Sequence, residues 1–209
     1  MTALVEDVPS PIDFHDRAQA RAWMEATIKS RPWRPDFFAA FTKAINDLEG
    51  ASKRVIELGS GPGHLAKEIV QHCDIEKYVA LDFSRAMHEL TREHLGDQCD
   101  KVQFIECDFR ADDWVRNVDP CDIAVSMQAI HEVRHTAHQP PLFKDTFNVL
   151  KPSGTFLYSD HYYEAGTEKH PNLMLGKAEQ PELLARTGFK SIQLLLDKGG
   201  MALYQARKP

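Results

Sequence analysis

The chain of 209 residues has few cysteines and no long apolar segment. Its four cysteines, at positions 73, 99, 107 and 121, form no CxxC pair, and three of them lie in or beside apolar runs. This usage is typical of free thiols in a reduced setting. No stretch approaches the roughly 20 apolar residues that cross a bilayer, and residues 1–14 lack the apolar run of a signal peptide. We therefore expect a cytoplasmic protein without membrane contact.

Positive charge is also not in excess. The chain has 25 lysines and arginines against 31 acidic residues, a net charge of −6. Such a balance gives no reason to expect binding to nucleic-acid backbones or to anionic membranes. The sequence also has no internal repeat. Its length suits one domain with an extension.

The first fifty residues differ in pattern from the rest. Residues 14–29 and 36–48 are expected to be helices, and two prolines within residues 31–35 interrupt them. We predict that residues 1–50 form an arm and a helical lid. Residues 51–209 are expected to form the main domain.

Short apolar strands alternate with helices after residue 51. The seven expected strands span residues 54–58, 78–82, 102–106, 122–126, 155–159, 192–196 and 202–205. The last two are joined by Asp197-Lys198-Gly199-Gly200, which predicts a hairpin turn. Regular alternation of this kind indicates an α/β fold with a doubly wound, mostly parallel sheet covered by helices on both faces.

A glycine-rich turn follows the first of these strands. Residues 57–63 read E-x-G-x-G-x-G, and a helix is expected next. Such a turn brings backbone N–H groups close to a bound anion. Residues 61–66 also satisfy the dinucleotide pattern G-x-G-x-x-A, so an NAD-binding site is the competing interpretation.

Three features favour a different cofactor. Glu57 places a carboxylate where a pyrophosphate would be repelled but a cationic amine would be attracted. The residues after the turn complete one sheet and leave little chain for a separate substrate domain. Tyr158, Tyr162 and Tyr163 are each followed four residues later by a residue other than the lysine of the short-chain dehydrogenases.

Five segments resemble the motifs of the class I S-adenosylmethionine-dependent methyltransferases, in the order that the family has them. The segments are residues 55–63, 79–84, 105–109, 122–131 and 149–156. The resemblance extends over residues 50–209 and implies a Rossmann-like methyltransferase fold with S-adenosyl-L-methionine as cofactor.

The resemblance also implies roles for individual residues. Glu57 would hold the amino group of the cofactor, Asp82 the ribose hydroxyls, Phe83 a face of the adenine, and Asp108 the adenine amino group. The cofactor-binding residues implied in this way are Glu57, Gly59, Ser60, Gly61, Gly63, Asp82, Phe83, Cys107, Asp108, Phe109 and Ser126.

The carboxyl ends of the fourth and fifth strands are expected to face the transferred methyl group. His131, Glu132 and His161 are the candidate catalytic residues there, with His131 preferred as general base or orienting group. A structural role for His131 remains the alternative. Residues 131–135 also read H-E-x-x-H, a zinc motif that requires a continuous helix. Prolines at 140 and 141 argue against one, and we expect no metal.

The acceptor is expected to be a small organic molecule. Residues 126–129 lack the Pro-Pro-aromatic stretch that is usual in enzymes that methylate exocyclic amines of nucleic-acid bases. The helical lid, with Trp23 and Trp33, suits a small pocket. An RNA or protein acceptor, and a regulatory protein that binds the cofactor without turnover, remain alternatives.

Overall fold

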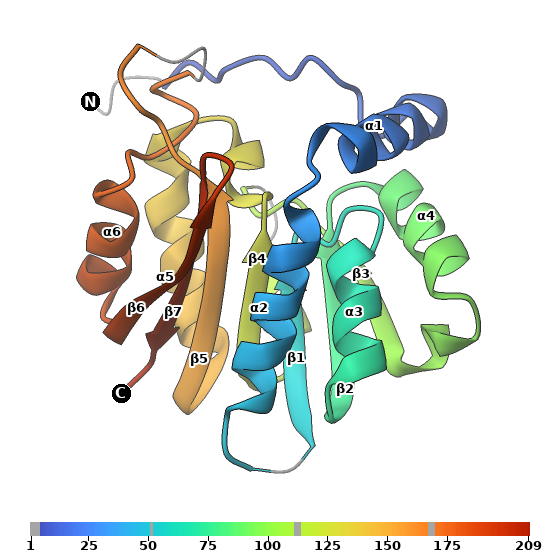
Figure 1. The fold of residues 1–209 in the computed structure, drawn as a ribbon, viewed down its shortest axis with the longest axis vertical. Coiled ribbons are helices and arrows are strands. Elements are labelled where there is room, and N and C mark those ends of the chain that lie inside the picture. Colours follow the sequence, from blue (N-terminus) through green and yellow to red (C-terminus); the bar gives the residue numbers. More distant parts are fainter. Residues whose placement is uncertain (1–4, 51, 111–113, 167–169) are drawn as a thin grey trace.

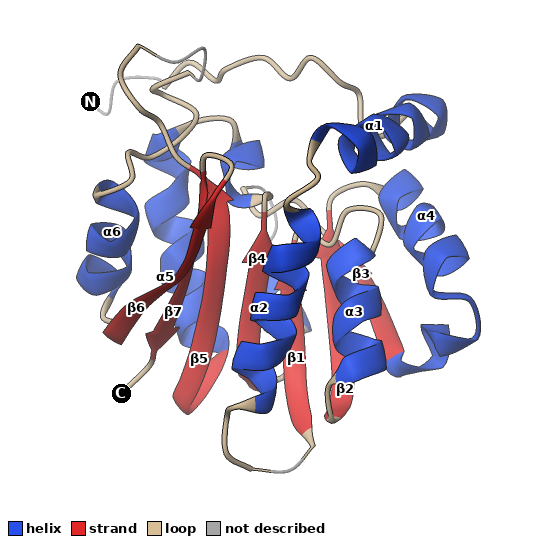
Figure 2. Ribbon diagram, viewed as in Figure 1, coloured by secondary structure: helices blue, strands red, loops and turns tan. Residues whose placement is uncertain are grey.

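The computed structural model describes residues 5–50, 52–110, 114–166 and 170–209. Within them, one seven-stranded sheet has the order β3-β2-β1-β4-β5-β7-β6 (Figure 2). The strands are β1 Lys53–Leu58, β2 Ile75–Asp82, β3 Val102–Glu106, β4 Cys121–Met127, β5 Leu150–His161, β6 Lys190–Lys198 and β7 Met201–Arg207. Strand β7 pairs antiparallel with both β5 and β6, and the other neighbouring pairs are parallel. The predicted doubly wound α/β fold and its closing hairpin are confirmed.

Helices cover both faces of the sheet (Figure 1). They are α1 Arg17–Ser30, α2 Arg34–Asn46, α3 His64–His72, α4 Arg85–Leu95, α5 Gln139–Val149 and α6 Glu179–Thr187. Helices α2 and α3 bury their apolar sides on one face, whereas α5 and α6 pack on the other. Within the described ranges, no helix is long and apolar enough to cross a membrane.

The strand order reverses between β1 and β4, next to the glycine turn. From this point, β1, β2 and β3 follow one another toward one edge of the sheet, and β4 and β5 follow one another toward the other edge. In open α/β sheets, ligands bind outside the carboxyl ends of the strands at such a switch point. Helix α1 lies across this edge of the sheet in Figure 1.

The two N-terminal helices have different surroundings. Phe37 and Phe41 of α2 are completely buried in the core that includes β1 and α3. Helix α1 buries only Ala20 and Thr27 and contacts α4. The segment expected to be a lid is therefore divided, because α2 is part of the core and only α1 covers the edge of the sheet.

Candidate active site

The glycine turn is shaped by its neighbours on β2, α4 and the loop after β4. Gly59 has a φ of 70°, and a Cβ atom there would lie 2.3 Å from the Cβ of Ala129. The Gly61 N–H donates to Asp82 at 2.8 Å, and the Thr91 hydroxyl donates to the Gly61 carbonyl at 2.7 Å. These contacts hold the turn in one conformation, in which Gly59 and Gly61 line cavities that Trp23 of α1 also lines.

Two adjoining cavities lie between this turn and α1. The larger has a volume of about 620 Å³ and is lined by Phe14, Trp23, Gly59, Gly61, Asp82, Phe83, Met87, Asp108, Phe109, Gln128, Ala129, Glu132 and Val133. The smaller has about 390 Å³ and is lined by Trp23, Arg34, Glu57, Gly59, Ser60, Gly61, Pro62, His64, Leu65, Met127 and Gln128. Trp23, Gly59, Gly61 and Gln128 belong to both linings and so mark the junction.

The larger cavity combines carboxylates with aromatic walls. Burial raises the pKa of Asp82 to about 6, although the N–H groups of Ser84 and Gly61 favour its ionised form. Asp108 accepts from the Arg110 N–H at 2.8 Å. Phe83 and Phe109 line the same cavity. Two hydrogen-bond acceptors beside aromatic rings suit a ligand with hydroxyl groups and a flat amino-bearing ring.

The smaller cavity contains polar atoms without a protein partner. Within the part of the chain that the structure describes, Arg34 Nε, Ser60 Oγ, His64 Nε2 and Gln128 Oε1 are buried and accept or donate no hydrogen bond. Unsatisfied buried polar atoms are costly, so a group of them around one cavity indicates a polar ligand. Arg34 stays cationic at neutral pH, although burial lowers its pKa to about 10.

Glu57 adds an acid to the same cavity. It is 2% exposed and accepts a hydrogen bond from the Tyr78 hydroxyl at 2.7 Å. Burial raises its pKa to about 8, against the lowering effect of Tyr78. A cavity with the Arg34 guanidinium and the Glu57 carboxyl group is suited to a zwitterion, whose carboxylate would meet the cation and whose ammonium would favour the ionised form of Glu57.

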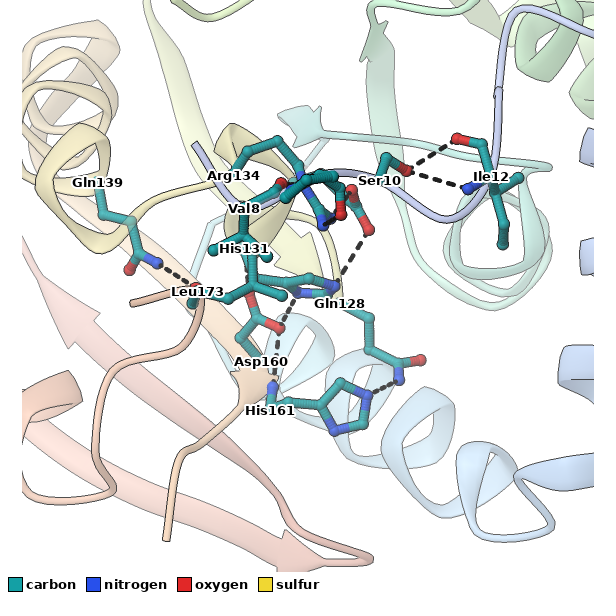
Figure 3. A network of polar contacts seen from close by, with 12 residues as sticks. Val8, Ser10, Ile12, Gln128, His131, Arg134, Gln139, Asp160, His161 and Leu173 are labelled. Carbon is teal, nitrogen blue, oxygen red and sulfur yellow. Dashed lines mark hydrogen bonds and ion pairs between the residues drawn. The ribbon is translucent and has the colours of Figure 1, made fainter. Parts of the chain in front are cut away.

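A histidine–carboxylate cluster lies at the ends of β4 and β5 (Figure 3). Asp160 accepts from His131 Nδ1 at 2.6 Å, from the His131 backbone N–H at 3.0 Å and from the His161 backbone N–H at 2.8 Å. Glu132 Oε1 lies 3.3 Å from His131 Nε2, and Glu132 Oε2 accepts from Arg134 Nη1 at 2.7 Å. The cluster ties the loop after β4 to β5.

This environment argues against His131 as a general base. Burial lowers its pKa, but Asp160 and Glu132 outweigh burial and raise it to about 10. Burial raises the pKa of Glu132, but His131 and Arg134 outweigh that effect and lower it to about 2. His131 is thus an imidazolium and Glu132 a carboxylate at neutral pH. The geometry supports the alternative of a structural His131.

His161 also has both ring nitrogens occupied. Its Nδ1 lies 3.3 Å from the carbonyl oxygen of Gly200, and its Nε2 lies 2.8 Å from Gln128 Nε2. Its ring stands edge-on to Trp33, with the centroids 6.2 Å apart. His161 therefore positions Gln128 and does not line either cavity itself.

Most of the predicted cofactor residues line the two cavities, but three do not. Gly63 is the N-cap of α3, and a Cβ there would lie 2.4 Å from Thr91 Cγ2, so the close packing of α3 and α4 requires glycine. The Ser126 hydroxyl donates to the Leu58 carbonyl at 3.0 Å and joins β4 to β1. Cys107 is buried in the core. These three residues stabilise the elements around the cavities without lining them.

Arg34, His64 and Gln128 were not singled out by the sequence analysis. Arg34 lies at the start of α2, in the segment that was assigned to the lid. His64 begins α3 directly after the glycine turn. The position of His64 at the N-terminus of a helix, directly after the glycine turn, could have indicated a place near the ligand. Arg34 carried no signal, because its approach to the glycine turn depends on tertiary packing.

The H-E-x-x-H segment is not a continuous helix. The 3₁₀ helix η3 Ile130–Val133 ends at Arg134, which has a φ of 66°, and His135 has an extended backbone. The ring of His138 is paired with Asp7 of the N-terminal arm at 2.8 Å. Among the described residues, no group of three or more His, Cys, Asp or Glu side chains is arranged to hold a metal ion.

Comparison with known proteins agrees with this architecture. Residues 55–154 match a family described as "Methyltransferase domain". A sterol 24-C-methyltransferase of Aspergillus fumigatus is 31% identical over 136 residues, which cover 59% of this chain and 33% of that protein. The chain thus spans about a third of the length of this curated relative.

Solved structures share the fold at low sequence identity. A putative methyltransferase of Haloferax volcanii, solved with the Trm112 activator, has a TM-score of 0.72 and 20% identity, covering 96% of this chain and all of its own. Human N-acetylserotonin methyltransferase, solved with S-adenosylmethionine, has a TM-score of 0.68 and 17% identity, covering 93% of this chain and 57% of its own.

Proposed function

We propose that this chain, which carries a class I methyltransferase domain, transfers a methyl group from S-adenosyl-L-methionine to a small organic acceptor. The observation that carries the proposal is the pair of joined cavities. One offers carboxylates and aromatic rings, and the other offers a cation, an acid and unsatisfied polar atoms. The two ends of the cofactor, an adenosine and an amino acid, have the complementary chemistry.

Each end has its own set of contacts in this proposal. Asp82 accepts from the ribose hydroxyls and Asp108 from the adenine amino group, while Phe83 and Phe109 enclose the ring. Arg34 binds the carboxylate of the amino-acid end, with Ser60 and the His64 ring as further polar contacts. Glu57 binds the ammonium group. Charge-assisted contacts of this type are each worth about 1.5–3 kcal/mol.

The junction of the cavities is the expected site of methyl transfer. When bound, the cofactor supplies a methyl group that is already activated by a sulfonium. The protein then has to align the acceptor atom, the methyl carbon and the sulfur, and such positioning is worth roughly 7–11 kcal/mol. Trp23 of α1 and Gln128 of the loop after β4 line this junction. Trp23 also closes it from above and excludes water.

A small acceptor suits the enclosure. Helix α1 and the N-terminal arm cover the carboxyl edge of the sheet. The arm is attached to the loop after β4, because Arg134 donates to the carbonyl groups of Val8 and Pro9 at 2.8 and 2.7 Å. An acceptor therefore has to fit beneath these segments. An RNA or protein acceptor would need them displaced.

Calorimetry tests the cofactor assignment. S-adenosylhomocysteine should bind with a dissociation constant in the micromolar range, about −8 kcal/mol, and NAD should not bind. Asp82→Ala should weaken binding at least about tenfold, because both ribose hydroxyls lose their acceptor. The exposed Asp100→Ala is the matched control. NAD binding, or equal affinity in Asp82→Ala, would refute the proposal.

Transfer is tested separately with radiolabelled S-adenosylmethionine and a fractionated metabolite extract. Label in a product of low molecular mass supports the proposed acceptor class. Label only in macromolecules would favour the RNA or protein alternative. Tight binding of S-adenosylhomocysteine without transfer to any fraction would favour the regulatory protein.

A further inference from the structure

The Gln128 side chain lies at the junction of the cavities and has one unused polar atom. It is 9% exposed, and its Oε1 has no hydrogen-bond partner in the described part of the chain. Its backbone has a φ of 58°, and its N–H donates to the Ser159 carbonyl at 2.9 Å. The backbone of Gln128, directly after β4, is therefore held in the left-handed region, which residues other than glycine rarely adopt.

The orientation of the Gln128 amide follows from its neighbour. The Gly200 carbonyl can only accept, so a His161 ring with a single proton carries it on Nδ1 and has a lone pair on Nε2. The group 2.8 Å from that lone pair must then be the donating NH₂ of Gln128. In Figure 3 the Gln128 oxygen points away from His161. This carbonyl oxygen is free to accept a hydrogen bond from a ligand.

Among the described residues, the histidine and glutamate side chains that follow β4 and β5 near Gln128 are already engaged. Both nitrogens of His131 face carboxylates, and both nitrogens of His161 are engaged. Glu132 lines the larger cavity, but its two oxygens are held by His131 and Arg134. Gln128 Oε1 thus offers the methyl acceptor a partner for an N–H or O–H donor at this junction.

We propose that the acceptor is an uncharged amine whose N–H donates to Gln128 Oε1 while its lone pair faces the methyl carbon. This inference rests on the proposed function. The new N–C bond forms as the C–S bond breaks, and the electron pair of the C–S bond stays on sulfur. The product is an ammonium ion, which loses its extra proton to water after release. No protein base takes part.

Other acceptor atoms fit the junction less well. An alcohol needs a base to become nucleophilic, and His131, Glu132 and His161 are all engaged. A thiolate or a carboxylate would bring a negative charge beside Glu132 and a carbonyl oxygen. An alkene would leave Gln128 Oε1 without a donor. The ammonium product, by contrast, lies beside the Trp23 and Phe14 rings, whose faces attract cations.

Sinefungin provides a direct test, because it carries an amine where S-adenosylmethionine carries its methylsulfonium group. We expect sinefungin to bind at least about tenfold more tightly than S-adenosylhomocysteine in calorimetry. Gln128→Met should remove most of this difference and change the affinity for S-adenosylhomocysteine less than about threefold. Gln139→Met, at a buried glutamine outside both cavities, should preserve the difference.

The outcomes separate the two proposals. If neither compound binds, the proposed function fails. If both bind wild type equally, or if Gln128→Met keeps the full difference, the amine proposal is refuted while the proposed function stands. The wild-type comparison needs no variant, so it remains decisive even if Gln128→Met does not fold.

The labelled product gives a second readout. An N-methylated amine from the metabolite extract should be retained on a cation exchanger under acidic conditions and survive mild alkaline treatment, which cleaves methyl esters. A labelled product that is uncharged under those conditions, or that is cleaved by alkali, would contradict the proposal.

Discussion

Helices α1 and α2 are neighbours in sequence and similar in length, with 14 and 13 residues, but they are held by different forces. Helix α2 buries Phe37, Phe41, Ala44 and Ile45 in the core. Helix α1 rests on α4 through a small apolar cluster, in which Ala20 and Trp23 pack near Met87, and through exposed ion pairs of Arg17 and Arg21 with Glu93. Helix α2 is therefore part of the main core, whereas we expect α1 to open without unfolding the sheet.

Both helices contribute a residue to the candidate active site. Arg34, the first residue of α2, reaches the smaller cavity, while Trp23 of α1 lines both cavities. In the proposed function, the core helix α2 supplies the cation for the amino-acid end of the cofactor, and α1 supplies an aromatic cover. We expect ligand entry to move α1 while α2 stays in place.

The largest expected difference between the two helices is the loss of unfolding free energy when an aromatic residue is replaced by alanine. Phe41→Ala in α2 should lower the free energy of unfolding by about 3–5 kcal/mol, because it leaves a cavity in a fully packed core. Trp23→Ala in α1 should cost only about 1 kcal/mol. Urea unfolding measures both. Equal losses would show that α1 is as much a part of the core as α2.

The next effect concerns Arg34 at the helix break. Arg34→Met should weaken binding of S-adenosylhomocysteine about 10–100-fold, because the cofactor carboxylate loses a charged partner. Binding of 5′-methylthioadenosine, which lacks the amino-acid end, should not change. Arg31→Met is the matched control, since Arg31 lies in the same break but lines neither cavity. A similar loss for both ligands would place Arg34 outside the carboxylate site.

Glu57, under the same break, should make cofactor binding pH-dependent. Its pKa of about 8 in the free protein means that it is mostly protonated at neutral pH. The cofactor ammonium favours the ionised form, so binding should release a proton. The affinity should then rise up to tenfold per pH unit below about pH 8 and level off above it. Calorimetry in two buffers of different ionisation enthalpy measures the proton.

Glu57→Gln provides the control for this pH dependence. The substituted protein should bind more weakly and release no proton. If the wild type binds with the same affinity throughout the range and releases none, Glu57 does not face the cofactor ammonium.

The smallest expected effect is that of the ion pairs on α1. Arg21→Ala removes a contact of 2.6 Å with Glu93 at an exposed position and should cost at most about 1 kcal/mol. The cost should fall at high salt, because exposed charges are screened. Comparison of melting temperatures at low and high salt is the measurement. A cost that does not depend on salt would contradict an electrostatic attachment of α1.

The fold was predictable from the sequence because the strands that define it are buried. Strands β1 and β4 are almost entirely inside, so their apolar runs are continuous and easily recognised. The glycine turn was also recognisable, because the backbone there requires glycine at fixed spacing. As predicted, residues 55–154 match a methyltransferase-domain family, and the fold is that of solved methyltransferases.

The surroundings of His131 were not predictable, because they depend on residues that are distant in sequence. Asp160, 29 residues further along the chain, pairs with the ring and fixes its charge. Sequence position placed His131 correctly at the end of β4 but said nothing of this partner. Arg34 was missed for the same reason, since only the packing of α2 brings it to the glycine turn.

Hydrogen exchange with and without S-adenosylhomocysteine tests the central claim most directly. The account predicts that amides of residues 17–30 exchange fast in the free protein and slow down on ligand binding, while those of residues 34–46 and of β1 stay protected in both states. Protection of residues 17–30 equal to that of β1 without ligand would contradict the account. So would exchange of residues 17–30 that the ligand leaves unchanged.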